Sequence, residues 1–171
     1  MHRAGEEPVP GHRLVEFLGQ GKFGEVWKAL GPGDVTKALK FIDVTGQKGL
    51  KEFRGVRRVR DVRHANLVLI TDIWLLDEAG NVLDEKALVH LEREGYGHRG
   101  DLDDTLTVAP DPAKRRELVV AMEFGERSLK QVLEHYKKMG QAGIPIRELL
   151  DYMDGAARGL DYLHKPQHAP I

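Results

Sequence analysis

The sequence contains no cysteine, which excludes disulfides and thiolate metal sites and suits the cytoplasm. Its net charge is only −1, so there is no electrostatic case for nucleic-acid binding. Its longest apolar runs, such as residues 67–70, are far too short to cross a bilayer, and the first eight residues lack the apolar core of a signal peptide. We therefore expect a cytoplasmic protein with neither a nucleic-acid partner nor a membrane segment.

What remains is the composition of a soluble globular protein, with 41% hydrophobic and 31% charged residues. A chain of 171 residues can form one domain. Among the eight histidines only His164 and His168 are four residues apart, and we expect no metal site in this chain.

A glycine-rich stretch at residues 19–26 is the most informative segment. Glycine inside strand-like sequence costs roughly 0.5–1 kcal/mol relative to alanine. Close approach of backbone N–H groups to a phosphate is the usual compensation. The candidate phosphate-binding residues are Gly19, Gln20, Gly21, Lys22, Phe23 and Gly24.

Three phosphate-binding motifs compete for this stretch. A Walker-type loop fails because Gly24 is followed by Glu25 rather than by Lys and Ser or Thr. A dinucleotide fold initially fits, because Asp43 lies 19 residues after Gly24. However, only six residues separate Gly24 from the turn at residues 31–34, too few for a crossover helix. The spacing favours the third motif, a glycine-rich β-hairpin over a nucleotide.

In this hairpin, residues 25–30 form the second strand and residues 35–44 the third. Strand alternation places Ala38, Lys40 and Ile42 on one face and Leu39 and Phe41 on the other. Gly24, Val26 and Lys28 likewise share a face. Val26 and Ala38 are small enough to cover an adenine ring, and Lys40 would then point towards the phosphates. The alternative for Lys40 is an ordinary edge-strand lysine.

Gly19-x-Gly21-x-x-Gly24-x-Val26, followed by Ala38-Leu39-Lys40, resembles the glycine-rich loop and lysine strand of the protein kinase family. The resemblance covers about residues 12–164. It implies an α+β fold in which a small lobe has a five-stranded antiparallel sheet and one helix. We expect a flexible leader at 1–11, the small lobe at 12–122, a hinge at 123–128, and two helices of a partial large lobe at 129–171.

Residues 46–63 have the periodicity of the small-lobe helix. Glu52 lies four residues before Val56, on the expected inward side, and a carboxylate there requires a partner. In the kinase family a helix glutamate pairs with the strand lysine, so Glu52 with Lys40 is the candidate ion pair. The family's usual spacing from His64 instead points to Gly55. Either the helix carries an extra turn or the ion pair is missing.

We expect a fourth strand over residues 67–76, a turn at 77–81 and a fifth strand over 117–122. The intervening residues 84–115 are interpreted as a surface insertion, with an adaptor or regulatory role open. Met122 resembles the kinase gatekeeper, although it also suits a plain core position. The resemblance assigns adenine contacts to the backbone of Glu123 and Phe124. Ser128 heads a helix-capping box, and a ribose contact is its second, weaker interpretation.

Residues 145–164 are expected to form an amphipathic helix. In the kinase family the catalytic loop and the metal-binding aspartate follow this helix, and neither motif occurs here. The resemblance therefore implies the ATP-binding part of a serine/threonine kinase, a transferase whose parent acts on protein hydroxyls with Mg²⁺. This chain alone is expected to be catalytically incomplete. A pseudokinase-like nucleotide-binding or interaction module is the alternative.

Overall fold

The computed structural model describes residues 1–21, 24–44, 55–83 and 116–165. The chain divides into two compact units, each of which is described by itself. The first comprises Met1–Asp61 and Ile70–Met122, and the second comprises Val62–Leu69 and Glu123–Ile171. The first unit thus ends at Met122, and residues 62–69 group with the second unit.

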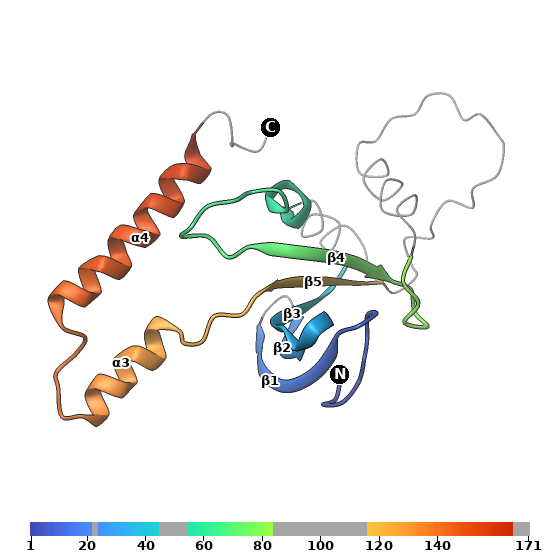
Figure 1. Cartoon of the computed structure of the whole chain (residues 1–171), viewed down its shortest axis with the longest axis horizontal. Coiled ribbons are helices and arrows are strands. Elements are labelled where there is room, and N and C mark those ends of the chain that lie inside the picture. Colours follow the sequence, from blue (N-terminus) through green and yellow to red (C-terminus); the bar gives the residue numbers. More distant parts are fainter. Residues whose placement is uncertain (22–23, 45–54, 84–115, 166–171) are drawn as a thin grey trace. The chain divides into compact units, whose positions relative to one another are not determined.

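The first unit contains a five-stranded sheet in the order β1-β2-β3-β5-β4 (Figure 1). The pairs β1–β2, β2–β3 and β4–β5 are antiparallel. The fourth strand begins at residue 70 rather than 67, and a short 3-10 turn, Pro32–Asp34, joins β2 to β3. The predicted five-stranded sheet is confirmed, with strands β1 (Arg13–Gly21), β2 (Gly24–Leu30), β3 (Thr36–Asp43), β4 (Ile70–Leu76) and β5 (Glu117–Glu123).

The two faces of this sheet carry separate apolar clusters, as strand alternation predicts. We call the face with Leu39 and Phe41 the leader face, because the segment before β1 packs on it. Its buried cluster contains Val9, Leu14, Trp27, Ala29, Leu39, Phe41, Leu76, Val119 and Ala121. The other face, called the lysine face, carries Lys40 and Ile42. Its buried cluster contains Ile42, Val44, Leu75, Leu118 and Val120.

The segment before β1 is ordered, which corrects the expectation of a flexible leader at residues 1–11. The Gly5 N–H donates to the Leu14 carbonyl, and the Leu14 N–H donates to the Glu6 carbonyl, both at 2.8 Å. Val9 is only 1% exposed and belongs to the leader-face cluster. Burial of an apolar side chain and pairing of backbone groups together oppose the entropy of a loose terminus.

The predicted turn after β4 is stabilised by one carboxylate. Asp77 accepts hydrogen bonds from the backbone of Ala79 and from both the backbone and the side chain of Asn81, at 2.8–3.1 Å. These bonds, led by the one from the Asn81 side chain, hold the pKa of Asp77 below its usual value. Such local bonding is typical of Asp at the start of a turn.

The first half of the predicted helix at residues 46–63 and all of the insertion at 84–115 lie outside the described residues. Residues 55–59 are helical and the helix ends before Arg60, four residues short of the expected end at Arg63. Val56 packs against the lysine-face cluster. Within the described ranges, no helix has both the length and the apolar character needed to cross a bilayer.

The second unit contains α3 (Leu129–Lys138) and α4 (Ile146–His164), drawn in orange to red in Figure 1. Ser128 caps α3: its Oγ accepts from the Gln131 N–H at 3.3 Å, and its own N–H donates to Gln131 Oε1 at 2.7 Å. The capping-box prediction is therefore confirmed. Tyr136 on α3 and Tyr152 on α4 both donate to the Glu148 carboxylate, which links the two helices.

The predicted amphipathic helix α4 begins at Ile146, directly after Pro145. One side approaches the loop before β4 so closely that a side chain at Gly159 would be crowded. A Cβ at Gly159 would lie 3.0 Å from the Asn66 carbonyl oxygen and 3.1 Å from Leu67 Cδ2. The apolar stripe lies elsewhere on the helix and is largely exposed, with Ile146, Leu150, Met153 and Leu160 between 45% and 67% exposed.

This packing predicts opposite outcomes for two glycines of α4. Gly155→Ala should stabilise the protein by about 0.5–1 kcal/mol, because alanine is the better helix former and the nearest atom is the movable Asn66 Nδ2. Gly159→Ala should instead destabilise the protein by about 1 kcal/mol, because the backbone carbonyl of Asn66 cannot move away as easily as a side chain can. Urea unfolding of both variants checks this, and equal gains in stability would contradict the packing.

Candidate functional site

The glycine-rich stretch forms the end of the β1–β2 hairpin. Gly21 pairs with Gly24, so only residues 22 and 23 separate the two strands, and these two lie outside the described residues. Gly24 begins a strand and not a helix, which excludes the dinucleotide motif and confirms the hairpin. β1 also carries an extra residue between Phe17 and Gly19, a bulge that bends the strand near the first glycine of the motif.

The three glycines of the motif differ in their surroundings. Gly24 has φ +129°, and a Cβ there would lie 1.7 Å from the Phe41 carbonyl oxygen on β3. At this position the close approach that requires glycine is therefore to the protein's own backbone, a cause that sequence analysis did not foresee. At Gly19, with φ +156°, and at Gly21, a Cβ would meet nothing within 4 Å. Open space at these two positions leaves room for a ligand to approach the backbone.

The register between β2 and β3 determines which side chains share the lysine face. Val26 lies opposite Lys40, and Lys28 lies opposite Ala38. Directly opposed residues of antiparallel strands project to the same side. Lys40 is half-buried, and Ala38 is 7% exposed. The structure thus brings together Val26, Ala38 and Lys40, as the alternation predicts.

Glu52, the candidate partner of Lys40, lies outside the described residues, so the ion pair stays a prediction. Two neighbours bear on it. Val56, four residues later, packs against the lysine-face cluster. Gly55 is exposed, and a Cβ there would meet nothing within 4 Å. Residue 55 is a glycine and has no carboxylate to offer, so Glu52 stays the predicted partner of Lys40.

Met122 is the last residue of the first unit and packs against the lysine-face cluster, so a core role accounts for it. Glu123, Phe124 and Ser128 belong to the second unit. The Glu123 N–H donates to the Leu69 carbonyl at 3.0 Å, so a contact from Glu123 to an adenine edge would have to use its carbonyl. Ser128 is engaged in the cap of α3.

Sequence analysis missed a cluster of charged groups on the leader face. His2 lies between Glu6 and Glu117, beside a cavity of about 520 Å³ that contains none of the predicted nucleotide-binding residues. No sequence signal could identify this cluster, because His2 and Glu117 are 115 positions apart. Among the described residues, no group of three His, Cys, Asp or Glu side chains is arranged to hold a metal ion, so no Mg²⁺ ligands are assigned.

Comparisons with known proteins give a structural likeness only. No protein-family model and no curated protein matched the chain. Two crystal structures of the Mycobacterium tuberculosis PknI kinase domain match with TM-scores of 0.55 and 0.56 at 18% sequence identity. A doubly substituted form of that domain matches with a TM-score of 0.51 at 20% identity.

Each match covers 96% of this chain and 51–52% of the kinase domain. The chain therefore spans about half the length of the solved structures that it resembles. A small lobe with a five-stranded antiparallel sheet, followed by the first helices of a large lobe, accounts for this half. The fold of the chain is accordingly that of part of a protein kinase domain.

Proposed function

We propose that this chain is the ATP-binding part of a protein serine/threonine kinase. The observation that carries the proposal is the juxtaposition of Val26, Ala38 and Lys40 on one face, next to a glycine hairpin. An ammonium group is a suitable partner for phosphates. Small apolar side chains next to it suit the flat, apolar faces of an adenine ring.

The roles follow from this placement. Val26 and Ala38 cover the adenine, and Lys40 positions the phosphates with Glu52 as its ion-pair partner. The backbone near Gly19 and Gly21 approaches the phosphates, since open space surrounds both glycines. The remaining contacts rest on the resemblance alone: the backbone of Glu123 and Phe124 on the adenine edge, and Ser128 on the ribose.

Phosphoryl transfer to protein hydroxyls is assigned to the parent protein and not to this chain by itself. The 171 residues contain neither a His-Arg-Asp nor an Asp-Phe-Gly motif. These motifs supply the catalytic base and a Mg²⁺ ligand in protein kinases. We therefore propose that the chain binds nucleotide without transferring phosphate, and that Mg²⁺ is held by residues of the parent outside this sequence.

Binding and transfer can be tested separately. A thermal-shift titration of the chain with ADP and a non-hydrolysable ATP analogue should raise the unfolding temperature with saturating dose dependence, because a ligand that binds only the folded state stabilises it. GTP at the same concentrations serves as the base-specificity control. Incubation with radiolabelled ATP should give no labelled protein. A flat response to both adenine nucleotides would contradict the proposal, and incorporation of label would overturn its catalytic part.

A further inference from the structure

The segment that precedes β1 crosses the leader face as a strap, defined here as residues 1–12. Its backbone is tied to the start of β1 by the Gly5–Leu14 and Leu14–Glu6 hydrogen bonds. Val9 is its apolar anchor in the leader-face cluster. The far end of the strap carries His2, whose contacts are polar and aromatic rather than aliphatic.

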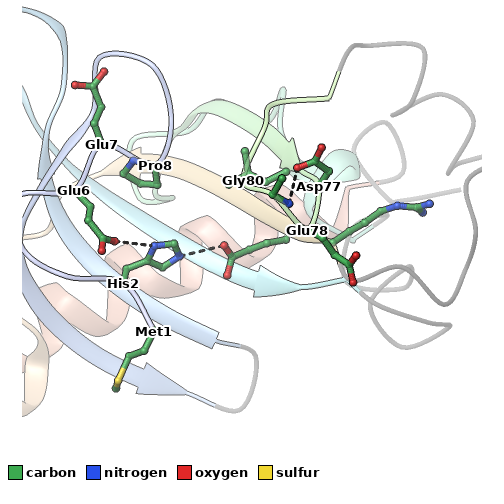
Figure 2. A pocket seen from close by; sticks show the side chains of 12 residues that line it. Met1, His2, Glu6, Glu7, Pro8, Asp77, Glu78 and Gly80 are labelled. Atoms are coloured by element: carbon green, nitrogen blue, oxygen red, sulfur yellow. Dashed lines mark hydrogen bonds and ion pairs between the residues drawn. The ribbon is translucent and has the colours of Figure 1, made fainter.

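His2 connects the strap to three strands of the sheet. Its ring lies against Phe41 of β3, with ring centroids 3.9 Å apart. Its Nε2 lies 3.1 Å from Glu117 Oε2 of β5, and its backbone N–H donates to Glu25 Oε2 of β2 at 3.2 Å. The other ring nitrogen, Nδ1, lies 3.4 Å from Glu6 Oε2 within the strap. Figure 2 shows dashed contacts at both ring nitrogens, one of them to Glu6.

This arrangement specifies the charge of the ring. Ionised carboxylates only accept hydrogen bonds, and a neutral imidazole has only one N–H to donate. Two carboxylates, one at each ring nitrogen, are therefore both satisfied only by the imidazolium form. In agreement, the hydrogen bond to Glu117 raises the pKa of His2 above its ordinary value of 6.5, although partial burial opposes the shift.

The charges around His2 come from every element that packs near it. Glu6 and Glu7 belong to the strap, and Asp77 and Glu78 to the turn after β4. The strands contribute the carboxylates of Glu25 on β2 and Glu117 on β5, and the Met1 ammonium lies 3.9 Å from Glu25. The buried Arg116 directly precedes β5. Carboxylates outnumber cations in this set, so the surroundings favour a protonated ring.

We propose that the strap is a pH-dependent latch, held closed over the leader face by protonated His2 and released when His2 loses its proton. The direction follows from linkage: a group whose pKa is raised by folding stabilises the folded state below its unfolded pKa. That stabilisation is lost as the pH rises through the folded value. Burial acts to raise the pKa of Glu25, but its hydrogen bonds, above all the one from Trp27, lower that pKa overall. The stabilisation of the folded state by Glu25 is therefore lost as the pH falls through the lowered value.

The latch is independent of the proposed nucleotide binding, and its charge state can be measured directly. An NMR titration of the histidine ring signals in the whole chain, with His2 assigned by its absence in His2→Gln, should give a His2 pKa above 6.5. Glu117→Gln should lower that pKa, because it removes the charge nearest to Nε2. A His2 pKa at or below 6.5, or one unaffected by Glu117→Gln, would overturn the proposal.

The closed state is reported by the amides that tie the strap to β1. After correction for intrinsic exchange, the Gly5 and Leu14 amides should lose protection from hydrogen exchange as the pH rises through the His2 pKa. In His2→Gln their protection should be low and independent of pH over this range. His135→Gln, at an exposed position of α3, should retain the wild-type profile. Wild-type protection that is constant with pH would show that His2 does not control the strap.

Discussion

Gly24→Ala is expected to destabilise the protein by about 3 kcal/mol or more, because it combines backbone strain with a collision. The residue has φ +129°, which is unfavourable for any residue with a side chain. The new Cβ would lie 1.7 Å from the Phe41 carbonyl oxygen, and β3 cannot retreat without disturbing the buried Phe41 side chain. Denaturant unfolding measures the loss.

Gly21→Ala is the matched control for this substitution. It lies opposite Gly24 in the same hairpin, and its Cβ would meet nothing within 4 Å. We expect a change in stability of less than about 1 kcal/mol. If phosphates approach the backbone here, the same variant should weaken nucleotide binding while leaving the fold intact. Equal loss of stability in the two variants would contradict the distinction between a packing glycine and a binding glycine.

Lys40→Ala should weaken ATP binding by about 10- to 100-fold, the loss expected when a charge-assisted contact is removed. The unfolding temperature of the protein without nucleotide should change far less than that of the complex, since Lys40 is only half-buried. Isothermal titration calorimetry with ATP measures the affinity.

Lys37→Ala provides the control on the same strand. Lys37 lies opposite Ala29, a member of the leader-face cluster, and therefore projects from the other face of the sheet. It has the same charge and a similar half-buried environment, and its loss should leave the affinity for ATP unchanged. Equal weakening by both substitutions would indicate a general charge effect and would contradict a specific role for Lys40.

The centre of the sheet could be predicted from the sequence because it depends on a turn and two strands that are close together in the sequence. The turn at residues 31–34 fixes the reversal between β2 and β3, and a period of two then assigns each side chain to a face. Val26, Ala38 and Lys40 meet for this reason. The cap of α3 was equally predictable, because Ser128 and Gln131 are three residues apart.

The missed features depend on contacts between distant parts of the chain. The strap has no strand or helix periodicity, and His2 meets Phe41, Glu25 and Glu117 only after the sheet has formed. The reason for Gly24 was also misjudged. The sequence shows that glycine is required, and it does not show whether a phosphate or the Phe41 carbonyl approaches.

The exposed stripe of α4 is a third difference. Ile146, Leu150, Met153 and Leu160 follow the helical period as an inward face would, yet all four are at least 45% exposed. The close contact of α4 with the loop before β4 runs through Gly155 and Gly159, which a hydrophobic pattern does not identify. A position where a backbone carbonyl approaches closely is marked by glycine, which has no side chain, and not by an apolar residue.

The most direct test of nucleotide binding at the lysine face is an NMR titration of the ¹⁵N-labelled chain with ADP. The account predicts saturable shifts of the Gly19, Gly21, Val26, Ala38 and Lys40 amides, with smaller changes in the strap. Saturable shifts confined to the strap and to the turn at residues 77–80, with the lysine face unaffected, would contradict it.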